Sequence, residues 1–217
     1  MAARSIKIAE EASPRRVFVW ALDWPGWCRS GRDRDAALEA LVAAAKRYAV
    51  VATSAGIDFR VVSDPEVETV TQVQGGSGTD FGVPSVVIED DRQPVKPAQA
   101  KKLAALVASS WAVFDTIAAT APEVLKKGPR GGGRNTSQVM AHVDEADGSY
   151  AREMGIKQKP PADRGAVEAM RASMLDILAQ PSDGSPLAGR KWPQRYAARR
   201  IAWHALDHAW EIEDKSQ

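Results

Sequence analysis

Two of the three histidines in this chain lie four residues apart near its C-terminal end. His204 and His208 belong to a segment, 199–214, with helical periodicity. A spacing of four places both imidazoles on one face of a helix, one above the other. The third histidine, His142, lies far upstream in a second segment with the same periodicity. Imidazoles that converge from two such helices could share one metal ion.

Burying three imidazoles together favours a divalent cation. Each buried ring needs hydrogen-bond partners or a metal, and three neutral rings that face one another leave lone pairs unmatched. Three protein nitrogens with an open fourth position are typical of catalytic zinc sites. No glutamate follows His204, so the zincin motif with its adjacent general base is missing, and no catalytic acid or base is assigned. The alternative is that each histidine hydrogen-bonds locally to a carbonyl or a carboxylate.

Charged residues near the histidines could support such a site. Asp207 and Glu211 lie beside the pair on the same predicted helix. They could orient the ligating rings through hydrogen bonds, or they could lie on a solvated face. The loop 126–134 is basic and rich in glycine. Its backbone N–H groups, with Arg130 and Arg134, could hold a phosphate or carboxylate, and the alternative is a solvated connector.

The composition is that of an ordinary soluble globular protein. The 217 residues are 44% hydrophobic and 26% charged, with a formal net charge of +1, which gives no general attraction to nucleic acid or to an anionic membrane. Cys28 has no second cysteine to pair with; we interpret it as a buried or incidental thiol, which fits a reducing compartment. Residues 1–11 lack the apolar core of a signal peptide. We expect a cytoplasmic protein without nucleic-acid or membrane partners.

The residue pattern of the first half of the chain is typical of a small α/β unit. Apolar, β-prone runs predict strands at 17–22, 59–62, 67–73 and 83–88, whereas residues 1–14 look polar. A Pro-Gly turn follows the first strand. A helix capped by Asp33 or Asp35 is expected to run to about residue 48. We assign residues 1–92 to this unit.

The second half changes to helical periodicity. A polar, proline-containing stretch at 90–97 is the expected linker. Four helices are predicted after it, at 97–121, from an N-cap at Asn135 to Gly155, at 163–178, and from Pro193 onward. Residues 97–217 would then form a four-helix bundle, and the fold class of the whole chain would be α+β.

The apolar stripes of two of these helices carry the histidines. On the last helix, both histidines fall on a stripe that would face a bundle core, together with Ala197, Ile201 and Ile212. His142 lies between two valines of an equivalent stripe. A separate stripe of Trp203, Leu206 and Trp210 fits packing against the first unit, or against a second subunit in a homodimer. Three nearby arginines are expected to be solvated or paired with acidic residues: Arg195, Arg199 and Arg200.

The order and placement of the histidines resemble the DinB/YfiT-like metalloenzyme superfamily. The resemblance spans roughly residues 97–217. It depends on one inward-facing histidine on the second predicted helix of the bundle and on the segment 203–211, whose sequence is WHALDHAWE. It implies a zinc or nickel ion bound by His142, His204 and His208. It also implies a thiol-dependent S-transferase or isomerase that uses a low-molecular-weight thiol such as mycothiol or bacillithiol, although many members have no known activity. The long N-terminal unit departs from the minimal family pattern.

A second resemblance concerns the N-terminal unit alone. The strand, Pro-Gly turn, cysteine and following alanine-rich helix, starting at 19–31, resemble HicB antitoxins, in which such a unit masks a toxin. The plainer alternative is a packing or dimerisation unit. Three hypotheses follow: a metal-dependent enzyme acting with a thiol or water on a small electrophile, a non-catalytic metal- or ligand-binding association module, and an antitoxin or nucleic-acid binder. The near-neutral charge argues against general phosphate-backbone binding.

Overall fold

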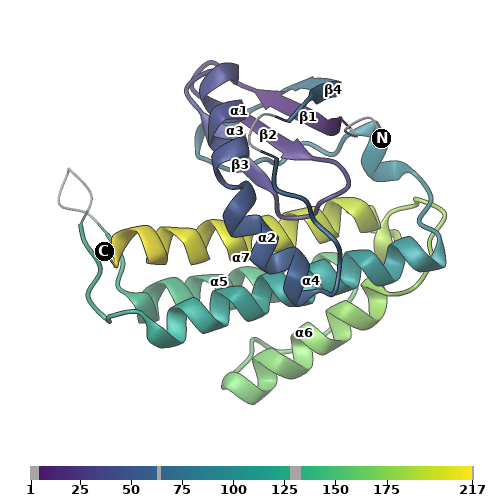
Figure 1. The fold of residues 1–217 in the computed structure, drawn as a ribbon. Coiled ribbons are helices and arrows are strands. Elements are labelled where there is room, and N and C mark those ends of the chain that lie inside the picture. Colours follow the sequence, from purple (N-terminus) through teal and green to yellow (C-terminus); the bar gives the residue numbers. More distant parts are fainter. Residues whose placement is uncertain (1–4, 63–64, 128–132, 217) are drawn as a thin grey trace.

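A mixed four-stranded sheet with two helices lies over a bundle of four long helices (Figure 1). The structure is a computed structural model that describes residues 5–62, 65–127 and 133–216. The predicted α+β class is confirmed. The elements in chain order are β1 (Ile6–Ala12), β2 (Val17–Ala21), β3 (Cys28–Gly31), α1 (Arg34–Ala43), α2 (Ala45–Ser54), β4 (Val67–Gln74), α3 (Ser77–Asp80), η1 (Glu89–Arg92), α4 (Pro97–Thr120), α5 (Thr136–Glu153), α6 (Arg164–Leu178), η2 (Leu187–Gly189) and α7 (Gln194–Lys215).

The sheet contains a central strand that the sequence interpretation missed. The strand order is β3-β2-β1-β4, with β1 antiparallel to β2 and parallel to β4. β1 looked polar because it contains two glutamates, yet Glu11 is completely buried. Its carboxylate accepts hydrogen bonds from the Thr79 hydroxyl at 2.6 Å and from the N–H groups of Ser85 and Val86 at 3.1 and 2.9 Å. These partners lie more than sixty residues away, so local sequence could not reveal that the charge is satisfied.

Two predicted strands, 59–62 and 83–88, are wrong, because neither segment joins the sheet. The N–H groups of the second segment bind the Glu11 carboxylate in place of a neighbouring strand. In the first segment, Phe59 packs edge-on into an aromatic cluster with Trp24, Trp27 and Tyr48. High β-propensity therefore marks apolar packing here and not strand pairing. The short strand β3 was also missed.

The predicted helices are confirmed with small changes at their ends. Asp33 caps α1 by accepting from the N–H of Ala36 at 2.9 Å. The helix breaks at Ala44 and continues as α2 to Ser54, beyond the predicted end. Asn135 is the N-cap residue of α5, and Pro193 directly precedes α7. The apolar stripes predicted for the bundle helices are largely buried, as expected.

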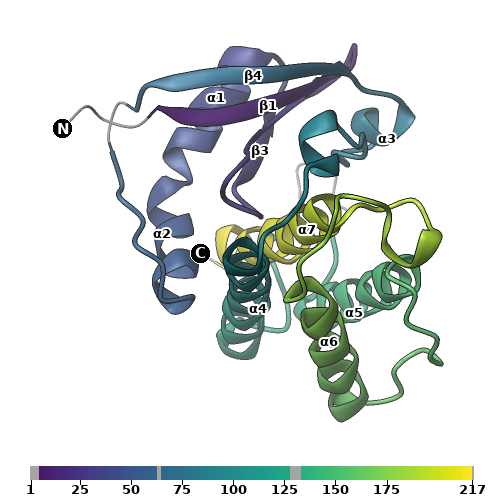
Figure 2. The ribbon, with the colours of Figure 1, turned by 90° about the vertical axis from the view of Figure 1, so that its right-hand side faces the viewer.

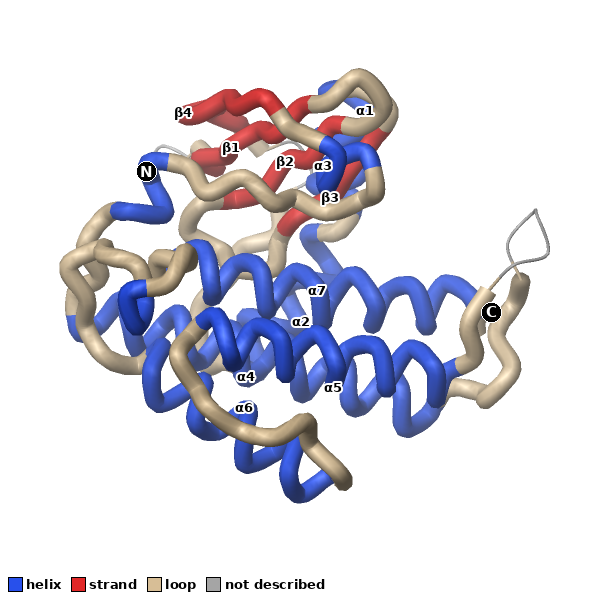
Figure 3. The backbone as a smooth tube through the Cα atoms, turned by 180° about the vertical axis from the view of Figure 1, so that it is seen from behind, coloured by secondary structure: helices blue, strands red, loops and turns tan. Residues whose placement is uncertain are grey.

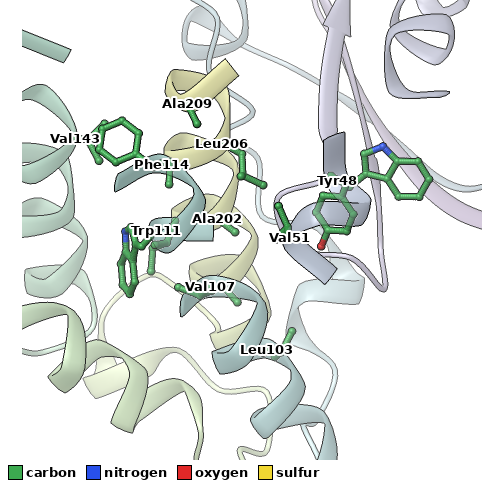
Figure 4. Packing of buried hydrophobic residues seen from close by; sticks show 14 of the residues in the cluster. Tyr48, Val51, Leu103, Val107, Trp111, Phe114, Val143, Ala202, Leu206 and Ala209 are labelled. Carbon is green, nitrogen blue, oxygen red and sulfur yellow. The ribbon is translucent and has the colours of Figure 1, made fainter. Parts of the chain in front are cut away.

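The N-terminal unit and the bundle share one hydrophobic core. Figure 3 shows all the strands on one side of α7 and α5 on the other, and α2 descends from the sheet to lie beside α4 (Figure 2). Tyr48 and Val51 of α2 face Leu103, Val107 and Leu206 of the bundle (Figure 4).

The predicted linker 90–97 belongs to this packing. Asp91 is buried and pairs with Arg199 of α7 at 2.7 Å, and Val95 is buried too. The predicted second stripe of α7, Trp203, Leu206 and Trp210, is buried against the N-terminal unit.

Helix α4 is long and apolar enough to cross a membrane by length and composition alone. In the structure it packs against α7, α6 and α2. Its residue Asp115 forms an ion pair with Arg171 of α6 at 3.1 Å. These contacts make α4 the core helix of the bundle, which explains its hydropathy.

The Pro-Gly turn between β2 and β3 packs directly onto α7. Gly26 has φ +92°, and a Cβ there would lie 2.8 Å from Leu206 Cδ1 and 3.0 Å from Ala202 Cβ. We expect Gly26→Ala to lower the free energy of unfolding by about 2–5 kcal/mol, because backbone strain and overpacking add. Gly56 also has a positive φ, but no atom lies within 4 Å of its added Cβ, so Gly56→Ala should cost only about 1–2 kcal/mol. Urea unfolding of both variants measures the difference, and equal losses would contradict the tight contact.

Candidate metal centre

The structure brings the three predicted histidines together between two helices. His142 comes from α5, and His204 and His208 come from α7. Their ring centroids lie 4.7–5.1 Å apart, and one nitrogen of each ring lies within 4.8 Å of the others. His204 and His208 are buried, and His142 is partly exposed. The cluster thus has one exposed side, at α5.

The spacing of the ring nitrogens suits a small cation. The Nε2 atoms of His142 and His204 are 3.3 Å apart. Two ligands at zinc–nitrogen distances of about 2.0–2.1 Å in a tetrahedral site would be about 3.4 Å apart. The same distance also fits a long hydrogen bond from one ring to the other, which is the alternative without an ion. The ring nitrogens of all three histidines lie within 4.8 Å of one another, so shifts of at most about 1.4 Å would complete a tetrahedral set.

The local electrostatics favour the neutral form of two of the rings, those of His142 and His204, in which a lone pair is available. Burial lowers the pKa of His142, and the nearby Arg134 guanidinium and His208 lower it further. Burial, followed by His208 and Arg200, holds the pKa of His204 well below its usual range. Metal ligation requires deprotonated imidazole, so both rings are in the binding form at neutral pH. The buried Nδ1 of His204 has no hydrogen-bond partner among the described residues.

Of the two carboxylates expected to orient the histidines, only Glu211 contacts one. Its Oε2 lies 2.8 Å from His208 Nδ1, and this hydrogen bond is the main cause that lowers the Glu211 pKa to about 2. A charged carboxylate on Nδ1 fixes the tautomer and leaves Nε2 free for a cation. The carboxylate of Asp207 pairs instead with Arg29 of β3 at 3.2 Å, so its orienting role stays a prediction.

This difference gives a matched pair of variants. Glu211→Gln removes the charge that orients His208, and we expect a 10- to 100-fold loss in metal affinity. Asp207→Asn removes an equal charge from the neighbouring turn of the same helix, where no hydrogen bond to a histidine is formed, and should lower the affinity much less. Isothermal titration of the metal-free proteins with zinc measures both. Equal affinities in the two variants would contradict the assigned role of Glu211.

The structure gives a partial view of the predicted anion-binding loop. Arg134 Nη2 lies 3.9 Å from Glu211 Oε2, and its side chain is 40% exposed. Arg130 lies outside the described residues. Arg134 therefore places a positive charge at the edge of the histidine cluster, beside its exposed side.

Sequence reasoning missed the role of Arg200, which was expected to be solvated or paired with an acid. Its guanidinium lies 5.6 Å from the Tyr150 ring centroid and 4.8 Å from that of Trp203. No carboxylate among the described residues pairs with it. Tyr150 in turn contacts His204, with ring centroids 5.7 Å apart. The position of Arg200, four residues before His204 on one helix, was the available signal.

No protein-family model matches the chain, and neither curated proteins nor solved structures give a significant match. The resemblance to DinB-like proteins and the weaker one to HicB proteins stay predictions. The case for a metal centre is argued from the geometry of this chain.

Proposed function

We propose that the protein is a metal-dependent enzyme that binds one divalent ion, zinc or nickel, through His142, His204 and His208, and that it acts on a small thiol. The observation that carries the proposal is the convergence of three imidazoles, with one ring nitrogen of each within 4.8 Å of the others. Three ligands leave a coordination position for substrate. The DinB-like resemblance, in which relatives use thiols such as mycothiol, supports the substrate class.

Each side chain around the cluster has a part in this chemistry. A bound divalent ion supplies a Lewis acid that lowers the pKa of a thiol or water, making it a nucleophile at neutral pH. Glu211 holds the His208 ring in the tautomer that presents Nε2. Burial of His204 and His208 excludes water from two sides of the ligand set. Arg134, at the exposed side, offers a charge for the carboxylate of a thiol cosubstrate.

Cobalt substitution tests the proposal. Metal-free protein reconstituted with Co²⁺ should show the visible absorption of a tetrahedral site, and a low-molecular-weight thiol should add a sulfur-to-cobalt charge-transfer band. Turnover of thiol with an electrophile such as a maleyl compound or an epoxide should then depend on the metal. Tight metal binding with no spectral response to any thiol would remove the thiol-dependent activity and leave hydrolysis by activated water.

A non-catalytic module is the second candidate. The observation that favours it is the burial of His204 and His208 between α5 and α7. A metal there would mainly stabilise the fold. This candidate predicts that EDTA lowers the melting temperature while neither thiols nor small electrophiles alter the cobalt spectrum.

A further inference from the structure

A groove lies between α2, α4 and α7, away from the histidine cluster. Its volume is about 330 Å³, which is within the range of small-molecule sites, about 300–1,000 Å³. Helix α2 lies beside α4, and α4 packs against α7 (Figure 2). The groove is lined from all three helices, and its lining includes none of the proposed metal ligands. It is therefore a second concave site of the size of a ligand.

The walls of this groove are largely apolar. On α4 it is lined by Val113, Thr116 and Ile117, which are spaced by three and four residues and so share one face of the helix. Val50 of α2 and Trp210 of α7 line it from the other two helices. Trp210 is buried, whereas Val50 is 59% exposed. Covering such apolar surface with an apolar molecule is favourable, because it removes that surface from water.

The charges at the groove are already paired. Among the described residues that line it, Arg47 is the only cation and Glu213 the only anion. Arg47 Nε donates to Glu213 Oε2 at 2.9 Å, and Arg47 Nη2 lies 2.9 Å from Asp214 Oδ1. A carboxylate on a ligand would have to displace one of these partners, and an ammonium group would meet carboxylates that already hold a cation. The charge balance therefore favours a neutral ligand.

The extent of the exposed apolar surface favours a small molecule over a protein partner. A stable protein interface covers about 800 Å² on each partner. Of the large apolar residues that are exposed in the described part of the chain, Val50 alone lines the groove. Others, such as Phe81 and Val124, lie outside it. The groove can enclose one ligand, but no wider apolar patch around it is available to a second chain.

We propose that the groove between α2, α4 and α7 binds one neutral, largely apolar small molecule. The Thr116 hydroxyl donates to the Ala112 carbonyl at 2.8 Å, so its oxygen remains an acceptor for a hydroxyl or N–H group of the ligand. The ligand contacts the N-terminal unit through α2 and the bundle through α4 and α7. This site stands whether or not the histidines bind a metal ion.

Two fluorescent probes that differ by one charge test the proposal. Phenylnaphthylamine is neutral and brightens in apolar surroundings, and anilinonaphthalene sulfonate has the same rings with an added sulfonate. In titrations of the full chain we expect saturable binding of one neutral probe per chain, and binding of the sulfonate that is weaker by at least about tenfold. Equal or tighter binding of the sulfonate, or no saturable signal from the neutral probe, would overturn the proposal.

Matched valine-to-tryptophan variants locate the binding site. Val113→Trp places an indole in the groove and should weaken binding of the neutral probe by at least about tenfold. Val124→Trp makes the same change at an exposed position outside the groove and should keep the wild-type affinity. If Val113→Trp does not fold, Val50→Trp, at the exposed edge of the groove, takes its place.

The same variants give the results that would contradict a small-molecule site. Equal probe affinities in the groove variant and in Val124→Trp would place the bound probe elsewhere and overturn the proposal. So would a dimer of the wild-type protein in light scattering that the groove variant alone loses, because a second copy of the chain would then occupy the groove.

Discussion

Replacing His204 by alanine is expected to lower the affinity for a divalent metal ion by more than about 100-fold. Loss of a hydrogen bond to a ligand costs 10- to 100-fold, and loss of the ligand itself must cost more. His208→Ala should have the same effect. His142→Ala tests the contribution of α5, since without it only two nitrogens from one helix remain. Titration of the metal-free proteins with zinc, followed by calorimetry, measures all three.

The same variants should lose the stabilisation that metal gives to the fold. At a free zinc concentration of 100 times Kd, the wild-type protein should gain about 2.7 kcal/mol, or roughly 5–10 °C in melting temperature. Glu39→Gln changes an exposed residue of α1, outside the two helices that carry the histidines, and is the control that should retain the full shift. Equal zinc-dependent shifts in the wild-type protein and the alanine variants would contradict a shared site.

The second large effect is expected at a buried ion-pair network that joins α4, α5 and α6. Arg171 is buried and pairs with Asp147 at 2.9 Å, with Asp144 at 3.2 Å and with Asp115 at 3.1 Å. Arg171→Met would leave carboxylates buried without a counter-charge, and we expect a loss of about 3–5 kcal/mol in unfolding free energy. Arg164→Met removes an exposed partner of the same Asp115 and should cost about 1 kcal/mol or less. Comparable losses in urea unfolding would contradict the assigned importance of burial.

The network also predicts a pH dependence of stability. Burial raises the pKa of Asp147 from 3.8 to about 7, against the opposing effect of Arg171. Between these two values the folded protein keeps a proton that the unfolded chain has released. Stability from this group is therefore complete below about pH 4 and is lost as the pH rises through about 7, by about 1.4 kcal/mol for each unit between the two pKa values.

Asp147→Asn isolates this contribution, because asparagine keeps the shape but does not titrate. The unfolding free energy of the wild-type protein minus that of the variant should fall by a few kcal/mol between pH 4 and pH 8. Other groups titrate in both proteins and cancel in the difference. A difference that stays constant with pH would show that Asp147 is ionised throughout.

The helices could be predicted because their signals are local. The caps at Asp33 and Asn135 and the stripe of α7 depend on residues within one or two turns. The position of Glu211 was also accessible, because on a helix it lies about 20° from His204 and 60° from His208, whereas Asp207 lies about 60° and 100° from them. The carboxylate of Asp207 forms an ion pair with Arg29 of β3, a contact that the sequence did not reveal.

The sheet could not be predicted to the same extent because its signals are remote. β1 depends on a buried glutamate whose hydrogen-bond donors lie at 79–86. The segments 59–62 and 83–88 have the propensity of strands, but their apolar side chains and N–H groups find other partners. The spacing of Arg200 from His204 places both on one face of α7, but the packing of the Arg200 guanidinium against Tyr150 and Trp203 depends on tertiary contacts that no sequence spacing encodes.

X-ray absorption spectroscopy of the wild-type protein, with elemental analysis of the same sample, tests the central claim most directly. After reconstitution with zinc and removal of loosely bound ions, we predict one zinc per chain and a first shell with three imidazole nitrogens at about 2.0–2.1 Å. The three histidines of the chain are His142, His204 and His208, so this shell would identify the site. Zinc well below one per chain, or a shell with fewer than three imidazoles, would contradict the account.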